Sequence, residues 1–258
     1  MINRVGAGGQ IGFEALAQAE PDGYTIGFIN TPNVLTLPIE RRVRFHWRQF
    51  DLLGNILDDP GGFSVHRDHP IKSLDELAAY AKAHPGDVTV GTSGVGSDDH
   101  LAMLAFEKIA GVKMTHVPFG GAAPVRGALE GRHIVLGAVN IGEAKQFSEA
   151  GAPFRNLGQM SLKRVDIAPD VPTFKEQGYD IEMASLRGMA APKGLPPAIR
   201  QRLVDAVAKA ADDPEFRAKM KATYSPLRFL APAEYAAVLE SGEAQFQALW
   251  QEHPWAAK

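Results

Sequence analysis

Residues 88–123 read VTVGTSGVGSDDHLAMLAFEKIAGVKMTHVPFGGAA, and this stretch decides the fold. It opens with a short apolar run, Val88 to Val90, that is typical of a strand, followed by a Gly/Ser/Thr loop from Gly91 to Ser97. The next segment has the apolar spacing of a helix, with Leu101, Leu104, Ala105 and Ile109 on one side and Gly111 at its end. Lys113 to Val117 then predicts a second strand. The stretch therefore indicates a repeating strand, loop and helix.

The same alternation continues on both sides of this stretch. Downstream, the patterns predict a helix over Ala123–Leu129, a strand over Ile134–Val139 and a helix over Ile141–Glu149. Further expected elements are a helix over Ile11–Ala19, a strand over Tyr24–Ile29, a helix capped by Ser73 and Glu76, a capping box at Thr173 and Glu176, a strand over Ile181–Leu186, and helices that begin at Pro197, Pro214 and Pro232. Such an order favours an α/β fold with parallel sheets covered by helices.

Composition excludes several classes of protein. The 258 residues carry a net charge of −3, so no broad positive field is available for nucleic acid, and we expect no nucleic-acid partner. The chain has no Cys, which removes thiolate catalysis, disulfides and Cys-ligated metal sites. No window approaches 18 uninterrupted apolar residues, and residues 1–10 lack the pattern of an export signal.

Enzyme motifs fail at identifiable positions. The run from Gly91 to Val95 resembles a nucleophile elbow, but its last position is not glycine. A dinucleotide fingerprint that starts at Gly6 would need glycine where Ile11 stands, and no Walker phosphate loop is present. His66 and His69 lack the helical spacing of a zinc site. We therefore expect no catalytic residue, no cofactor and no metal.

Two loops have the features of an anion site. Gly91 to Ser97 offers backbone N–H groups and hydroxyls before a helix, and Pro118 to Ala123 offers bare N–H groups beside an aromatic ring. Loops that follow parallel strands face a common crevice, where open α/β sheets bind ligands. Alternative interpretations remain for the first loop: Ser97 is also a normal N-cap, and Asp98 and Asp99 would repel a nearby anion.

Several strings in order along almost the whole chain carry a family resemblance. They are Asn3-Arg4 with Gly6-Ala7-Gly8-Gly9 and Gly12, Pro21-Asp22-Gly23-Tyr24-Thr25, Lys72-Ser73-Leu74 with Glu76-Leu77, His116-Val117-Pro118-Phe119-Gly120-Gly121, Pro169-Asp170-Val171-Pro172-Thr173, and Ala191-Pro192-Lys193-Gly194-Leu195-Pro196. Together they resemble the Bug-type extracytoplasmic solute receptors of tripartite tricarboxylate transporters.

The resemblance implies a two-domain periplasmic-binding-protein fold of type II, the Venus-flytrap fold, with mixed or parallel sheets flanked by helices. One domain would comprise residues 1–63 and 189–258, and the other residues 64–188. It also implies a periplasmic, monomeric receptor without enzymatic activity, which binds a small carboxylate in an interdomain cleft and delivers it to membrane permease subunits. A sensor or scaffold of the same fold that docks a protein partner, and an α/β hydrolase-like enzyme, are the alternatives.

Transferred position by position, the resemblance suggests a set of ligand-binding residues. They are Asn30, Thr31, Ser93, Gly94, Ser97, His100, Phe119, Gly120, Gly121 and Asn140, together with Ser185 and Arg187, which stand where the chain should return between the two domains. Arg187 has the fork geometry that suits a carboxylate, although an ordinary surface ion pair is its alternative. For His100, a structural hydrogen bond is an equal alternative.

One departure from the resemblance concerns the start of the chain. Family members carry, ahead of the Asn3-Arg4 string, an export signal and a first strand whose glycine-rich turn helps to hold the ligand carboxylate. Here Met1 stands just before that string. We expect either a truncated product or a receptor with one strand fewer, an exposed sheet edge, an altered partner contact, and weak or absent ligand binding.

Overall fold

The computed structural model describes residues 2–4, 6–252 and 254–256, and the chain divides into two compact units. Unit 1 comprises Met1–Asp58, Ser185–Ala222 and Leu227–Lys258, and unit 2 comprises Asp59–Ala184 and Thr223–Pro226. The domain limits expected from the sequence, at 63/64 and 188/189, remain predictions. No helix within the described ranges is long and apolar enough to cross a lipid bilayer.

Unit 2 is built on a mixed sheet. Its strands are the C-terminal part of β2 (Phe50–His66), β3 (Thr89–Thr92), β4 (Thr115–Pro118), β5 (Leu136–Asn140) and β6 (Phe154–Gln159). β3 is parallel to both β4 and β5, whereas β2 lies antiparallel between β5 and β6. The parallel part therefore follows the predicted alternation, and the antiparallel strand makes the sheet mixed.

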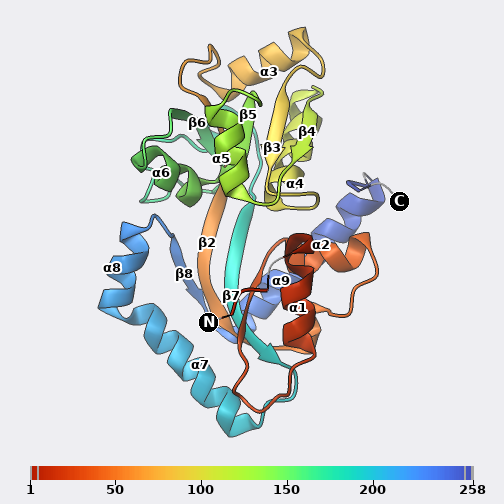
Figure 1. Cartoon of the computed structure of the whole chain (residues 1–258), viewed down its shortest axis with the longest axis vertical. Helices are drawn as coiled ribbons and strands as arrows, with labels where there is room; N and C mark the ends of the chain where they lie inside the picture. The colour runs from red at the N-terminus through yellow and green to blue at the C-terminus, as the bar shows by residue number, and fades with distance from the viewer. Residues whose placement is uncertain (1, 5, 253, 257–258) are drawn as a thin grey trace. The chain divides into compact units, whose positions relative to one another are not determined.

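Helices cover the sheet of unit 2 and bury its apolar side chains (Figure 1). They are α3 (Leu74–Ala83), α4 (Asp98–Ala110), α5 (Ala122–Glu130) and α6 (Ile141–Glu149), with a short 3₁₀ turn η3 (Lys175–Gln177). Phe63, Phe106 and Phe174 form the centre of the core, with ring centroids of neighbouring pairs 5.1 to 6.3 Å apart in edge-to-face geometry. A rigid core of this kind fixes the loops that leave the sheet.

Unit 1 contains a second small sheet. β1 (Gly27–Asn30) is antiparallel to β7 (Ala184–Pro192), β7 lies beside β2, and β8 (Leu227–Leu230) pairs antiparallel with the N-terminal part of β2. Its helical elements are η1 (Ala7–Gly9), α1 (Gln10–Ala17), α2 (Asn33–Glu40), η2 (Trp47–Gln49), α7 (Pro197–Asp212), α8 (Pro214–Ala222) and α9 (Pro232–Glu252).

Glu243 fixes α9 to the segment that precedes β2. Its carboxylate lies 2.7 Å from His46 Nε2, accepts a hydrogen bond from Trp47 Nε1 at 3.1 Å, and pairs with Arg48. Since α2 also packs against α9, these contacts anchor the helices that support β1 (Figure 1).

The length of β2 was not predicted. The strand passes without a break through Asp58, Asp59, Pro60, Gly61 and Gly62, residue types that usually favour turns. The glycines are needed for close packing, because a Cβ on Gly62 would lie 2.5 Å from the side chain of Ile141. Turn-forming residues thus serve tertiary contacts inside this strand.

Other sequence expectations were wrong in part. The strand expected over Tyr24–Ile29 is shorter and shifted, and Tyr24 is 94% exposed. Ile109, expected on the buried face of its helix, is 48% exposed. The reciprocal hydrogen bonds of the capping box at Thr173 and Glu176 are present, but only a three-residue turn follows them because Gly178 ends it in the left-handed region. The expected strand over Ile181–Leu186 begins at 184 and runs to 192. α2, β6 and β8 had no predicted counterpart.

Gly188 on β7 supplies a test of packing in unit 1. A Cβ there would lie 2.4 to 2.7 Å from the ring and hydroxyl of Tyr235, which is fully buried. Because overpacking a rigid core costs roughly 1–3 kcal/mol, we expect Gly188→Ala to lower the free energy of unfolding by about that amount. Urea denaturation measures it.

Gly127→Ala is the matched control for that substitution. Nothing lies within 4 Å of a Cβ at Gly127 in α5, so helix propensity alone predicts a gain of up to about 1 kcal/mol. Equal effects of the two variants would contradict the packing argument.

Candidate functional site

The loop that leads into α4 uses most of its own hydrogen-bond donors. Ser97 is the N-cap of α4: its Oγ accepts from the N–H of His100 at 3.3 Å and donates to the carbonyl of Gly94 at 2.8 Å. The N–H of Gly94 donates to Thr92 Oγ1, and that of Gly96 donates to Nδ1 of His100. These groups are therefore already satisfied inside unit 2.

Asp99 turns back from the first turn of α4 onto this loop. Its Oδ2 accepts hydrogen bonds from the N–H of Ser93 at 3.0 Å and from Ser93 Oγ at 2.5 Å, while Oδ1 is buried without a hydrogen-bond partner. Burial, and then the neighbouring carboxylate of Asp98, raises the pKa of Asp99 well above its ordinary value. The carboxyl group of Asp99 thus closes the loop onto the start of α4, and the donors of Ser93 are occupied.

His100 and His116 form a stacked pair of neutral rings beside the loop. Their ring centroids are 3.7 Å apart with an interplanar angle of 5°. Burial, and then proximity to His116, lowers the pKa of His100 to about 3, and burial also lowers the pKa of His116. Because Nδ1 of His100 accepts from Gly96, its proton sits on Nε2, which can act as a donor.

Asn140 joins three elements at the start of α6. Its Nδ2 donates to the carbonyl of Asp59 at 2.8 Å and to Oδ2 of Asp98 at 2.7 Å, and its N–H donates to Glu143 at 3.3 Å. Asp59 Oδ1 in turn accepts from the N–H of Gly142 at 2.9 Å. Like α4, α6 thus begins with its donors in use.

The start of α5 is different. Gly121 is its N-cap and makes no side-chain cap hydrogen bond, no acidic residue lies in the first turn, and a Cβ on Gly120 or Gly121 would meet no atom within 4 Å. The N–H of Phe119 donates to the carbonyl of Thr92, and the Phe119 ring lies against Gly91. Open N–H groups and a positive helix end make this junction suited to an anion.

Unit 1 has a comparable junction between β1 and α2. Thr31 Oγ1 accepts from the N–H of Leu186 at 3.0 Å, and Ser185 Oγ donates to the carbonyl of Thr31 at 3.2 Å. Asn30 pairs in register with Arg187 on β7. α2 starts after Pro32 without a side-chain cap or an acid in its first turn. Asn30, Thr31, Ser185 and Arg187 are therefore brought together.

The residues suggested for unit 2 also gather around the ends of β3, β4 and β5. Ser93, Gly94, Ser97 and His100 share one hydrogen-bond network, and Gly94 lies close to Phe119. Their role in binding stays a prediction. Sequence reasoning did not find Asp59, and it assigned Asp99 to the helix dipole and to repulsion of an anion, not to a hydrogen bond with Ser93. No local spacing rule reports a carboxylate that reaches back six residues across a glycine loop.

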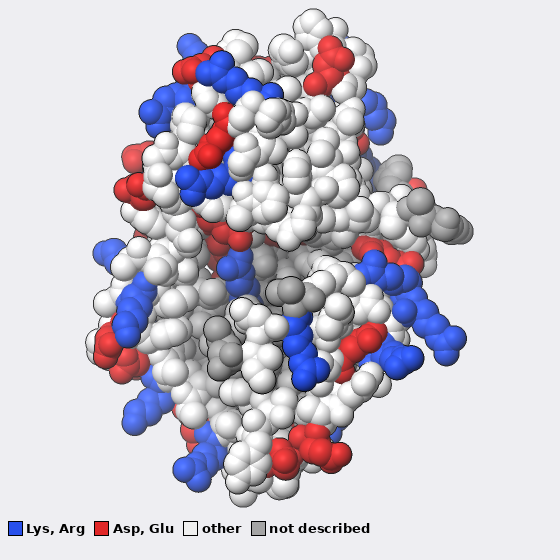
Figure 2. All heavy atoms as spheres, in the orientation of Figure 1, with Lys and Arg blue, Asp and Glu red and all other residues white. Residues whose placement is uncertain are grey.

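The face of the molecule in Figure 2 carries charge of both signs. Figure 2 shows basic and acidic side chains interspersed over the visible face, without a continuous field of either sign. Recognition of a small anion would therefore depend on local donors and not on long-range attraction.

Comparison with known proteins identifies the family. The family model for the tripartite tricarboxylate transporter family receptor, TctC, matches residues 1–229. The chain therefore belongs to the TctC receptor family, and the resemblance to Bug-type receptors is confirmed.

Individual relatives agree with this membership. A UPF0065 protein of Cupriavidus necator is 36% identical over 224 residues, which cover 83% of this chain and 65% of the relative. A TctC solute-binding protein from Polaromonas, solved without ligand, is 30% identical with a TM-score of 0.77, covering 98% of this chain and 86% of that one. An R. palustris protein solved with adipate is 27% identical with a TM-score of 0.89, covering 96% and 84%.

These matches also show the fold class and how much of its relatives the chain covers. The α/β fold with mixed sheets is that of periplasmic solute-binding proteins, as expected from the sequence. The chain spans only about two thirds of the length of the curated relatives, for example 65% of the C. necator protein and 62% of an Agrobacterium vitis protein. Family and structural neighbours are solute receptors.

The raised pKa of Asp99 predicts that the difference in stability between the native chain and the Asp99→Asn variant depends on pH. The folded state retains a proton on Asp99 that the unfolded chain loses, so this group costs stability as pH rises above its ordinary pKa of 3.8 toward its raised folded value. Asp99→Asn keeps an acceptor for Ser93 and removes that cost. The variant should gain stability over the native chain by up to about 1.4 kcal/mol per pH unit in that window.

Urea unfolding of the native chain and Asp99→Asn at several pH values from 4 to 8 measures this gain. Asp87→Asn is the control, because the Asp87 side chain is 69% exposed and its replacement removes the same charge. A constant difference between native and Asp99→Asn proteins across the range would contradict a protonated Asp99.

Proposed function

We propose that this chain is an extracytoplasmic receptor that binds a small organic carboxylate and delivers it to the membrane permease of a tripartite tricarboxylate-type transporter. Its family membership supports receptor function, and a relative of the same fold was solved with adipate. Periplasmic location, a monomeric state and binding in an interdomain cleft belong to the same proposal.

The observation that carries the proposal is the open start of α5. In unit 2, Ser73 caps α3, Ser97 caps α4, and the Asn140 and Glu143 pair serves α6. At α5 the corresponding N–H groups meet no side-chain cap, and the glycines leave space beside them. A carboxylate oxygen is the kind of acceptor that these donors lack.

Other groups suit the same ligand. Nε2 of His100 can donate a hydrogen bond without carrying a charge, and Arg187 with the uncapped start of α2 gives unit 1 a positive set of donors. Hydrogen bonds to charged groups contribute roughly 1.5–3 kcal/mol each, and micromolar affinity needs about 8 kcal/mol. A few such bonds are therefore enough.

A binding screen tests the proposal directly. Calorimetry and thermal shift with adipate, shorter and longer dicarboxylates, and monocarboxylates should reveal at least one ligand. At 100 times its Kd a ligand stabilises the protein by about 2.7 kcal/mol, which corresponds to several degrees in Tm. No binding of any acid, also by a chain extended at its N-terminus with the family's first strand, would favour the docking alternative, and turnover of an acid would favour an enzyme.

Gly120→Asp locates the carboxylate. An acidic side chain fits at Gly120, where a Cβ meets no atom within 4 Å, and it would place a negative charge beside the open donors of α5. We expect Kd for the best ligand to rise at least about tenfold, which corresponds to roughly 1.4 kcal/mol.

Gly127→Asp is the matched control, because it adds the same charge at an equally open position farther along α5. Its Kd should stay within about twofold of the native value. If both substitutions weaken binding equally, or neither does, the start of α5 is not the carboxylate site.

A further inference from the structure

Asp99 is a buried residue whose two carboxyl oxygens differ in what they contact. It is 3% exposed and is the second residue of α4, after the Ser97 cap. Its Oδ2 accepts from the N–H of Ser93 at 3.0 Å and from Ser93 Oγ at 2.5 Å, whereas Oδ1 is buried without a hydrogen-bond partner. A buried acceptor without a partner costs stability, and native proteins keep few of them. Such a group indicates that the contact with Ser93 does more than fill space.

The contact between Asp99 and Ser93 reaches the start of α5 through the neighbours of Ser93. Thr92 precedes Ser93, and its carbonyl accepts a hydrogen bond of 2.9 Å from the N–H of Phe119. Gly94 follows Ser93, and a Cβ on Gly94 would lie 3.7 Å from the carbonyl oxygen of Phe119. The loop that Asp99 holds therefore lies against the backbone of Phe119, directly before the glycines at which α5 begins.

The side chain of Phe119 also fixes the chain just before α5. Its ring packs against Gly91, where a Cβ would lie 3.1 Å from Phe119 Cε2, and against the apolar cluster that contains Val125. Gly120 and Gly121 follow, and a Cβ at either position would meet no atom within 4 Å. Because glycine has wide conformational freedom, the orientation of the open N–H groups depends on how Phe119 is held.

We propose that Asp99 positions the carboxylate site: by holding Ser93 it fixes Phe119, and through Phe119 the open N–H groups at the start of α5. This inference rests on the proposed function, because it assigns the support of that site. Asp99 acts without touching the ligand, since its carboxyl group is buried and turned to Ser93. Binding donors that are already ordered lose less conformational entropy than mobile ones, so loss of the contact with Ser93 weakens binding.

Two substitutions at Asp99 test this role by calorimetry. Asp99→Ala removes the acceptor for Ser93, whereas Asp99→Asn keeps one. The ligand is whichever of succinate, glutarate, adipate and acetate binds the native chain most tightly. Asp99→Ala should raise its Kd at least about tenfold, because donors that are no longer held must be ordered on binding. Asp99→Asn should keep Kd within about threefold of the native value, since an amide oxygen accepts the same hydrogen bonds.

Amide hydrogen exchange measures the positioning itself, without a ligand. The N–H of Phe119 is bonded to Thr92, so its exchange rate reports local opening between the two loops. We expect Asp99→Ala to speed this exchange at least about tenfold, and Asp99→Asn to leave it near the native rate. The N–H of Val135 is the internal control, because it bonds to Thr89 at the other end of β3. Its exchange should change no more than the global stability does.

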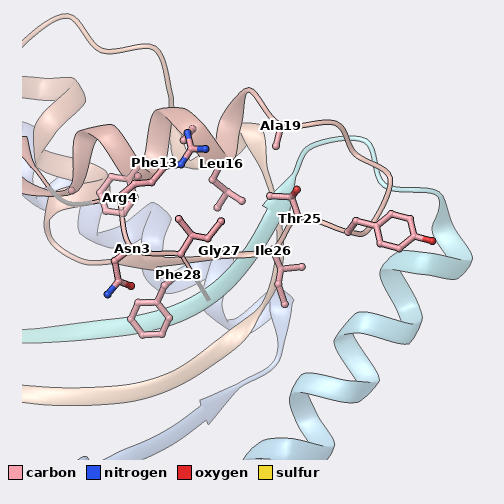
Figure 3. A pocket seen from close by; sticks show the side chains of 14 residues that line it. Asn3, Arg4, Phe13, Leu16, Ala19, Thr25, Ile26, Gly27 and Phe28 are labelled. Carbon is pink, nitrogen blue, oxygen red and sulfur yellow. The ribbon is translucent and has the colours of Figure 1, made fainter.

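Two control variants separate positioning from loss of stability. Ser73→Ala removes the cap of α3 in the same unit, where Ser73 Oγ accepts from the N–H of Glu76 at 3.2 Å. Ile26→Ala lies in unit 1, at a hollow of about 680 Å³ between α1 and β1 whose lining contains none of the residues suggested for carboxylate binding (Figure 3). Both variants should keep Kd within about twofold of the native value, because distant substitutions act independently.

A double-mutant cycle with Gly120→Asp tests the route from Asp99 to the site. Because both substitutions act on the start of α5, the effects of Asp99→Ala and Gly120→Asp on the free energy of binding should be less than additive. Additive effects would mean that Asp99 acts elsewhere, and they would overturn the proposal.

Three further results would overturn it. They are a native Kd in Asp99→Ala, an equal loss of affinity in Asp99→Asn, and exchange at Phe119 that changes no more than exchange at Val135. If no acid binds the native chain, the proposed function fails, and exchange at Phe119 still decides whether Asp99 positions the junction. If circular dichroism shows that Asp99→Ala does not fold, Ser93→Ala breaks the Oγ contact from the other side. Exchange at Phe119 should then rise about threefold, and an unchanged rate would overturn the proposal.

Discussion

The backbone N–H groups at the start of a helix must find an acceptor, and this requirement organises much of the chain. Where a side chain fills the need, the junction is closed and rigid. Ser97 does so at α4, and Asp59 accepts from Gly142 at the start of α6. Where glycine stands in place of a capping residue, as at Gly121, no side chain accepts from the first N–H groups of the helix. The presence or absence of a side-chain cap therefore distinguishes structural loops from candidate binding loops better than glycine content does.

The difference between capped and uncapped helix starts changes the interpretation of the two glycine loops. In the sequence, residues 91–97 contain more hydroxyls and glycines than residues 118–121 and therefore offer more groups that suit an anion. In the structure, Asp99, Thr92 and His100 consume the donors of that loop. In the loop of residues 118–121, the N–H of Phe119 donates to the carbonyl of Thr92, but the N–H groups at the start of α5 meet no side-chain cap. A loop that is rich in polar groups supplies its own partners as readily as it binds a ligand.

Local patterns predicted the parts of the fold that local physics controls. Helices with strong caps and regular apolar spacing, such as 141–149 and the helix after Pro197, begin where expected. The patterns indicated no strand over β2, which passes through Pro60 and two glycines where Ile141 packs against Gly62. α2 was missed because it follows a run typical of a turn and contains Pro38.

The candidate site was recoverable from the sequence to a limited extent. Family strings indicated candidate neighbourhoods, and the structure gathers Asn30, Thr31, Ser185 and Arg187 in one place. The buried role of Asp99 was not recoverable, because its reach to Ser93 depends on how the loop closes. The stacked imidazoles of His100 and His116 add a last consequence. Because burial lowers the pKa of both rings, and that of His100 to about 3, neither ring carries a charge at neutral pH, and the pair adds no positive charge beside the loop.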